Sequence, residues 1–167
     1  MMKRVDPKEL AMNPFKAIGE QWMLVTAGTA EQCNTMTASW GGVGVLWGKP
    51  VATAYIRPQR HTKKFMDEQE CFTLSFLPES QRANLTYCGQ VSGRDEDKIA
   101  HCGFTVETAE CGAPYFAEAE MVLVCRKMYR QRIDPADFVT DDVDRWYPEK
   151  DYHDMYIAEI VEAYQKS

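Results

Sequence analysis

Short segments rich in strand-forming residues recur along the chain and restrict its fold more than any other feature. They are residues 22–28, 34–40, 50–57, 71–76, 104–108 and 119–133. Residues 71–76 alternate between apolar and small hydroxylated side chains, which predicts a half-buried strand. Regular alternation of strands with helices is missing, so a doubly wound α/β fold is disfavoured. The pattern predicts an antiparallel barrel or sandwich.

Helix signals are few, and the helices that they predict are short. A helix is expected over residues 62–68, with Thr62 at its N-cap. Two more are expected over residues 80–88 and 95–102, the second capped by Asp95. These helices leave the chain mainly β.

Four segments have an irregular or ambiguous pattern. Residues 1–16 are interrupted by prolines and are expected to form an irregular lead-in, and residues 41–44 read as a flexible glycine loop. Residues 134–149 are acidic and are expected to form a loop with a short helix. The tail, residues 155–164, fits helical spacing, with a closing barrel strand as the competing interpretation.

Length and charge limit the class of protein. A chain of 167 residues is most simply one domain, residues 1–167, and can bury a sizeable core. Its net charge of −6 argues against a non-specific nucleic-acid binder. No apolar run approaches the roughly 18 residues of a membrane span, and no signal peptide is recognisable. The expected compartment is the cytoplasm.

The cysteines and histidines lack the spacing of metal sites. None of the six cysteines forms a C-x-x-C pair, so reduced thiols, several of them buried, are expected. The three histidines lack metal-ligand spacing, and no metal is expected. His153 beside Asp154 resembles an acid–base pair, but neighbours on a strand point to opposite faces. No protein residue is assigned a catalytic role.

A cluster of cationic and hydroxylated residues is a candidate anion site. Arg57 and Arg60 flank Pro58, and Thr62 follows at the start of the expected helix. Guanidinium groups match phosphate oxygens, and a helix N-terminus offers free N–H groups. Lys98, near the start of its own helix, is a further candidate. The alternatives are a solvated basic turn and a surface lysine paired with acidic neighbours.

The segment before the glycine loop has the groups that a flat heterocycle requires. Asn34 offers a donor and an acceptor, Thr37 and Ser39 share a strand face, and Trp40 can stack on a ring. The alternative is an ordinary strand with a buried tryptophan.

Several motifs, taken in order, resemble the flavin reductase-like family, the FMN-binding split barrels that include flavoredoxin. The resemblance extends from about Trp22 to Val161. Its motifs are Asn34-Thr35-Met36-Thr37-Ala38-Ser39-Trp40, Lys49-Pro50-Val51, Arg57-Pro58-Gln59-Arg60-His61-Thr62, Phe72-Thr73-Leu74-Ser75-Phe76, Ser92-Gly93-Arg94-Asp95-Glu96-Asp97-Lys98 and Tyr152-His153-Asp154-Met155-Tyr156-Ile157.

The resemblance implies a six-stranded antiparallel Greek-key split β-barrel that forms a homodimer and binds FMN non-covalently. It also makes the tail a strand. The residues implied for the isoalloxazine and ribityl chain are Asn34, Met36, Thr37, Ala38, Ser39 and Trp40. Those implied for the phosphate are Arg57, Pro58, Arg60 and Thr62. Those implied to approach the flavin from another side are Ser92, Gly93 and Lys98.

The implied chemistry is that of the flavin, which accepts a hydride or single electrons. The electron donor is either NAD(P)H, with reduction of a flavin, or a redox partner protein that uses this chain as a carrier. Trp40 and the glycine loop could shield the flavin, which favours the carrier somewhat. A non-catalytic binding module for haem or another tetrapyrrole is kept as an alternative.

Overall fold

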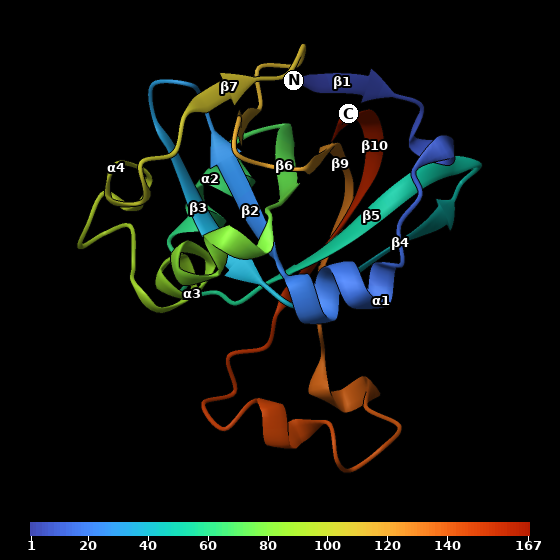
Figure 1. Cartoon of the computed structure of the whole chain (residues 1–167). Helices are drawn as coiled ribbons and strands as arrows, with labels where there is room; N and C mark the ends of the chain where they lie inside the picture. The colour runs from blue at the N-terminus through green and yellow to red at the C-terminus, as the bar shows by residue number, and fades with distance from the viewer.

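The computed structural model describes residues 1–167 and is built mainly from antiparallel strands, as expected (Figure 1). Eight of its ten strands form one sheet and two form a separate hairpin. Along the sheet the strands are β3 (Cys33–Ala38), β2 (Met23–Gly28), β6 (Cys71–Phe76), β9 (Met121–Arg132), β10 (Asp154–Lys166), β5 (Lys49–Ile56) and β4 (Gly41–Leu46), with β1 (Met2–Val5) paired to the end of β10. The hairpin joins β7 (Val106–Thr108) to β8 (Pro114–Phe116).

The chain connection between the two outermost strands requires the sheet to curl into a barrel. β3 and β4 lie at opposite ends of the strand order, yet only Ser39 and Trp40 separate them in sequence. A flat sheet of seven strands would hold its edges nearly 30 Å apart at about 4.8 Å per strand. Three Cα–Cα steps reach about 11 Å at most. The two edges therefore approach each other at Ser39–Trp40, where the barrel is split.

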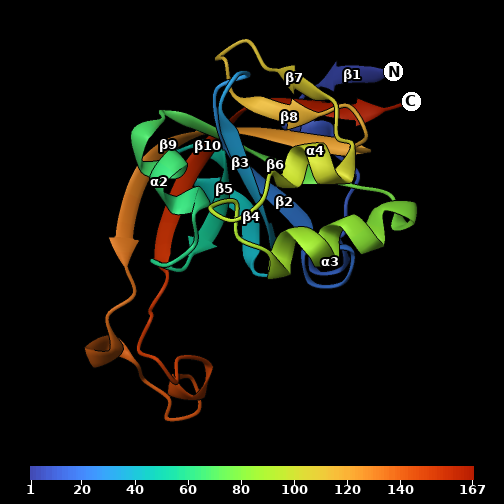
Figure 2. The ribbon, with the colours of Figure 1, turned by 90° about the vertical axis from the view of Figure 1, so that its left-hand side faces the viewer.

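The helices are short and lie outside the barrel. They are α1 (Pro14–Lys16), which continues into a π-helical turn (Ala17–Gln21), α2 (Thr62–Glu68), α3 (Arg82–Gln90) and α4 (Lys98–Cys102). Figure 2 shows α3 and α4 on the same side of the barrel. None of the helices is long and apolar enough to cross a membrane.

One long connection leaves the barrel. Residues 133–153, between β9 and β10, project away from the sheet in both views and contain the 3-10 turns Pro135–Asp137 and Asp144–Trp146 (Figures 1 and 2). We call this segment the arm. It is the loop with short helical turns that the sequence predicts.

Apolar side chains from opposite walls fill the barrel. Phe72 and Phe76 of β6 meet Tyr156 of β10 and Ile56 of β5, and all four are almost completely buried. The burial of β10 alternates over most of its length, as for a strand packed on one face. The tail is therefore a strand, as the resemblance implies, and the helical interpretation is wrong because pairing with three strands outweighs the spacing.

Three strands went unpredicted. β1 lies in the supposedly irregular lead-in, β8 is only three residues long, and β4 replaces the predicted glycine loop. β4 pairs with β5 through a two-residue turn at Trp47–Gly48, where both residues have positive φ. Such a turn matches the twist of a hairpin. The count of six strands was consequently too low, although the antiparallel barrel is confirmed.

Two predicted helix caps and one burial pattern are wrong. Thr62 is the first residue of α2 and is buried, while His61 occupies the N-cap position. Asp97, rather than Asp95, caps α4 by accepting a hydrogen bond from the Ala100 N–H at 3.0 Å. β6 is buried on both faces, because β8 and its neighbours cover the side that was expected to face solvent.

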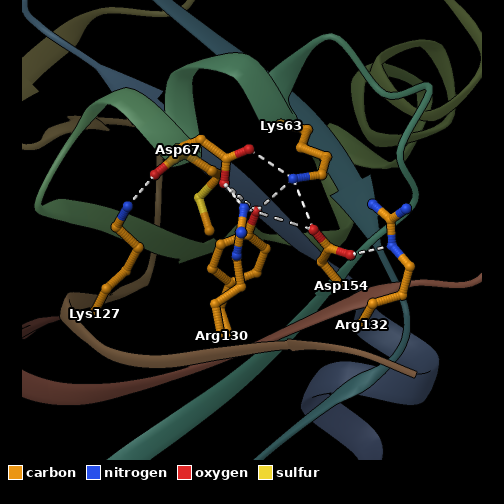
Figure 3. A network of polar contacts seen from close by, with 8 residues as sticks. Lys63, Asp67, Lys127, Arg130, Arg132 and Asp154 are labelled. Atoms are coloured by element: carbon orange, nitrogen blue, oxygen red, sulfur yellow. Dashed lines mark hydrogen bonds and ion pairs between the residues drawn. The ribbon is translucent and has the colours of Figure 1, made fainter. Parts of the chain in front are cut away.

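A network of charged side chains ties α2 to β9 and β10 (Figure 3). Lys63 of α2 pairs with Asp67 at 2.6 Å and with Asp154 of β10 at 2.8 Å. Asp154 also accepts a hydrogen bond from Arg132 Nε at 2.7 Å. The network fixes the start of α2, and with it Thr62, against the barrel.

Candidate functional site

Three adjoining cavities run from α4 to the split in the barrel. The first, of about 200 Å³, is lined by Arg60, Thr62, Ser92, Lys98 and neighbours, and we call it the basic cavity. The second, of about 190 Å³, shares Met36 and Arg60 with the first, and we call it the middle cavity.

The third cavity, of about 540 Å³, lies at the split and is largely apolar; we call it the apolar cavity. It shares Ser39, Trp40, Tyr55 and His153 with the middle cavity. The three cavities therefore lie next to one another, in a series that we call the path, from a charged end to an apolar end.

The structure brings the predicted residues together along this path. All of them except Pro58 line at least one of the three cavities. They are Asn34, Met36, Thr37, Ala38, Ser39, Trp40, Arg57, Arg60, Thr62, Ser92, Gly93 and Lys98. Pro58 lies in the turn between β5 and α2 and lines none of the three.

Two cations of the basic cavity, the buried Lys98 and the half-buried Arg60, lack a carboxylate partner. Lys98 is 3% exposed, and its ammonium donates only to the Cys88 carbonyl at 2.9 Å. Arg60 donates to the Gly89 carbonyl at 3.0 Å, and neither residue forms an ion pair. Buried charges are normally paired. Lys98 is therefore not a surface lysine paired with its acidic neighbours, and binding of an anion by the two cations stays a prediction.

The protonation of Lys98 is sensitive to this burial. Burial lowers the pKa of Lys98 to about 8, and the nearby Arg60 guanidinium lowers it further while the Cys88 thiol opposes the shift. Burial also lowers the pKa of Arg60. An anion between the two would restore the charged form of Lys98, because opposite charge favours it.

Thr62 offers the cavity a hydroxyl proton. Its Oγ1 accepts a hydrogen bond from the Asn34 side-chain amide at 2.8 Å, and the residue is only 1% exposed. The hydroxyl has no acceptor of its own in the structure. A phosphate oxygen in the basic cavity would accept that proton.

The loop before α4 packs closely against this group. A Cβ at Gly93 would lie 2.0 Å from Asn34 Oδ1, so any larger residue would displace the amide. Arg94 Nη1 donates to the Gln59 carbonyl at 2.9 Å and ties the loop to the turn before α2. We call residues 92–98 the phosphate loop.

Aromatic side chains surround the apolar end. Trp40 is 40% exposed and lies edge-on to Trp146 of the arm, with ring centroids 5.3 Å apart. His153 is buried beside Trp40, and its Nδ1 lies 2.8 Å from the Tyr147 hydroxyl. Burial lowers the pKa of His153 to about 4, with a further contribution from Arg57, so the imidazole is neutral at neutral pH.

His153 and Asp154 do not form an acid–base pair. His153 contacts Tyr147 and Trp40, whereas Asp154 binds Lys63 and Arg132. Their separate partners are those expected of neighbours on an extended chain.

Arg57 has partners that no sequence pattern pointed to. Its guanidinium pairs with Asp151 at 2.8 Å, donates to the Trp146 carbonyl at 3.0 Å and lies over the Tyr147 ring. These contacts attach the arm to β5. The role of Arg57 at a phosphate stays a prediction, and the uncompensated charge lies at Arg60 and Lys98.

We expect Arg57→Ala to affect the arm more than anion binding. Because the guanidinium is occupied by the arm, ligand affinity should change less than about threefold, well below the effect of losing a charged hydrogen bond to the ligand. Hydrogen exchange in residues 134–152 should accelerate, because the arm loses the contacts of Arg57 with Asp151, the Trp146 carbonyl and the Tyr147 ring. The assignment would be contradicted if Arg57→Ala lost as much ligand affinity as we expect below for the variant Lys98→Met, while hydrogen exchange in the arm stayed unchanged.

Sequence reasoning missed several residues of the site. Tyr55 of β5 lies two residues before Arg57, which directly follows the strand, and both line the middle cavity; this two-residue spacing was available in the sequence. Tyr147 lies in the irregular arm, where no periodicity exists to place it. Cys88 and Gly89 contribute backbone carbonyls, which every residue has, so the residue types at these positions do not predict the contacts.

The fold and the site together define a split barrel with a series of adjoining cavities that is basic at one end and apolar at the other. The family model described as flavin reductase like domain matches residues 15–167, and the chain belongs to this family. The resemblance inferred from the motifs is thus confirmed. Comparison with curated protein sequences finds no match.

Solved structures share the fold. Flavoredoxin from Methanosarcina acetivorans is 21% identical over 95% of this chain and 76% of that chain, with a TM-score of 0.68. Flavoredoxin of Desulfovibrio vulgaris (Miyazaki F) is 23% identical, covers 95% and 73%, and has a TM-score of 0.69. An FMN-binding protein from Thermus thermophilus with bound p-hydroxybenzaldehyde is 20% identical, covers 95% and 81%, and has a TM-score of 0.69.

Proposed function

We propose that this chain binds FMN along the three cavities and acts as an oxidoreductase of the flavin reductase type. The observation that carries the proposal is the pair formed by the buried Lys98 and the half-buried Arg60, which lacks a counter-charge in a protein of net charge −6. Membership of the family and the descriptions of similar structures as flavoredoxins and an FMN-binding protein support the choice of FMN.

The donor groups along the path fit the parts of this cofactor. Arg60, Lys98 and the Thr62 hydroxyl would hold the phosphate in the basic cavity. The strand from Met36 to Ser39 would border the ribityl chain and the ring edge through the middle cavity. Trp40 and the neutral His153 would border the ring in the apolar cavity, and their partners Trp146 and Tyr147 would limit access of water from the arm.

When bound, FMN supplies hydride and single-electron chemistry, and the protein supplies binding, orientation and shielding. The residues at the apolar end are uncharged, apart from Arg57, which is already paired with Asp151. The expectation that catalysis belongs to the cofactor, with no catalytic side chain, stays a prediction.

Two electron donors are compatible with the site. The size of the apolar cavity favours a small donor such as NADH or NADPH, which would need space beside the ring. The Trp40–Trp146 pair at the edge of this cavity would shield the flavin ring, and this favours a carrier that takes electrons from a redox partner protein. We propose the NAD(P)H-dependent reductase first and the carrier second.

Anaerobic mixing of the FMN-loaded protein with NADH, and separately with NADPH, tests the choice of donor. A reductase should bleach the bound flavin rapidly and turn over added free flavin. Absence of bleaching with both nucleotides, together with reduction by a ferredoxin-type protein, would overturn the reductase in favour of the carrier.

We further propose a homodimer in the cytoplasm. Phe15, Val45 and Trp47 expose large apolar surfaces, and of these Phe15 lines the apolar cavity at the split. A second copy that covers these residues would close the ring end of the site, and two-fold dimers are the commonest assemblies. Sedimentation of the protein at micromolar concentration should give twice the chain mass of 19.1 kDa; a mass of one chain would contradict the dimer.

We expect FMN affinity to fall above pH 8. Because the pKa of Lys98 is about 8 in the free protein, about a tenth of Lys98 is charged at pH 9, and the Kd should rise about tenfold between pH 7 and pH 9. The phosphate is fully ionised over this range. Titrations by flavin fluorescence should give a flat profile for riboflavin, which lacks the phosphate. An equal slope for both ligands would show that Lys98 is not responsible.

A further inference from the structure

Two cysteines meet between α3 and α4, beside the basic cavity. The Sγ atoms of Cys88 and Cys102 lie 3.7 Å apart, and both thiols are free. The preceding residues, Tyr87 and His101, stack nearly parallel with ring centroids 3.8 Å apart. The two helices therefore already hold the thiols against each other.

The chain between these cysteines contains the phosphate loop. Residues 89–101 include Ser92, Gly93 and Lys98, which all line the basic cavity. The Cys88 carbonyl itself holds the Lys98 ammonium at 2.9 Å. A bond between Cys88 and Cys102 would close this segment into a ring and fix the position of the cation.

We propose that Cys88 and Cys102 are a site of reversible disulfide formation, with hydrogen peroxide as the oxidant, and that the disulfide slows the release of FMN. The crosslink is argued from the thiol geometry alone. Its effect on FMN rests on the proposed function, because it requires the phosphate in the basic cavity.

The reaction balances with a single peroxide. The partly exposed Cys102 attacks one peroxide oxygen as a thiolate, the O–O bond breaks, and a sulfenic acid and water result. Cys88 then attacks the Cys102 sulfur, the S–S bond forms, and the sulfenic oxygen leaves as a second water. Two thiols lose two electrons and two protons, and the peroxide is reduced to two waters.

The environment of the thiols makes this a slow reaction at neutral pH. Burial raises the pKa of Cys88 to about 12, and burial also raises the pKa of Cys102, so few thiolates are present. Slow oxidation distinguishes this pair from a catalytic thiol, which reacts rapidly as a thiolate. Because thiols of raised pKa are also poor leaving groups, reduction of the disulfide by another thiol should be slow as well.

Peptide mapping after peroxide treatment tests the crosslink directly. Trypsin should place Cys88 in the peptide of residues 83–94 and Cys102 in that of residues 99–126, and these two should be recovered joined, with fragmentation assigning the bond to Cys102. Dithiothreitol should separate them. Oxidation of other thiols without this joined pair, or a bond from Cys88 to Cys111 or Cys125 of the same peptide, would overturn the proposal.

Two variants and one rate complete the test. Cys102→Ser should lose the crosslink, while Cys111→Ser should retain it; Cys88→Ala provides a second loss variant at the buried position.

The dissociation rate of FMN tests the effect of the disulfide on the site. In the oxidised wild type FMN should dissociate roughly three- to tenfold more slowly, because the phosphate loop is pre-organised. An unchanged or faster rate would overturn the effect on FMN, and a protein that binds no FMN would instead refute the proposed function while leaving the crosslink intact.

Discussion

Lys98→Met should weaken FMN binding about 10- to 150-fold and leave riboflavin binding almost unchanged. The variant removes one charged hydrogen bond to the phosphate, which contributes about 1.5–3 kcal/mol. Methionine is similar in length and can occupy the same buried position. Isothermal titration with both ligands gives the ratio directly, since riboflavin shares the ring and the ribityl chain but lacks the phosphate.

The same variant should make the free protein more stable. Lys98 is buried without a carboxylate, and burial of its charge is unfavourable below its pKa of about 8. Urea denaturation at pH 7 should therefore give a higher midpoint for Lys98→Met than for the wild type.

Lys64→Met is a matched control for both measurements. Lys64, like Lys98, is one of the cations near His61, but its side chain is exposed on α2. Its loss should change neither FMN affinity nor stability by a comparable amount. If both variants weakened FMN binding equally, net charge rather than a phosphate contact would be responsible. If Lys98→Met weakened the binding of FMN and of riboflavin equally, the assignment of Lys98 to the phosphate would be contradicted.

Asp154→Ala should lower the free energy of unfolding by about 1.5–3 kcal/mol, the scale of a hydrogen bond to a charged group, because the half-buried Lys63 loses the Asp154 carboxylate and keeps only Asp67. The Asp154 side chain is 4% exposed and accepts from Lys63 at 2.8 Å and from Arg132 at 2.7 Å. Chemical denaturation measures the loss. Asp142→Ala, at an exposed position of the arm, removes the same charge and should change the free energy by less than about 0.5 kcal/mol.

The stability that Asp154 provides should depend on acid pH. Burial alone would raise the pKa of Asp154, but hydrogen bonds from Arg132 and Lys63 hold it below its ordinary value. A carboxylate with a lowered folded-state pKa stabilises the protein above its unfolded-state pKa, about 3.9, and the contribution is lost as the pH falls through the folded value. The difference between wild type and Asp154→Ala should therefore shrink below about pH 4; a constant difference down to pH 2 would contradict the ion-pair account.

The sequence was most informative where chemistry and periodicity agree. β2, β3, β5, β6 and β9 all carry strand-forming residues bounded by turns, and they occur close to the expected positions. Most of the predicted site residues line the three cavities, some named for side-chain chemistry, such as the amide of Asn34 and the charge of Lys98, and others, such as Ser92 and Gly93, only through the family resemblance.

The sequence was least informative where tertiary pairing decides. Nothing local distinguishes the glycines of β4 from a flexible loop, because the strand exists only through its pairing with β5. The tail has helical spacing, and three neighbouring strands determine its structure. Likewise, the pairing of Arg57 with Asp151 depends on how the arm returns to the barrel, which no local pattern records.

The visible spectrum of the reconstituted protein tests the central claim most directly. Purified protein should be incubated with excess FMN, separated from free flavin by gel filtration and examined by absorption spectroscopy. The account predicts the blue and near-ultraviolet flavin bands at a stoichiometric ratio to protein in the wild type, with most of the flavin lost from Lys98→Met. Protein that elutes without flavin bands, or that is purified with the Soret band of a haem, would contradict it.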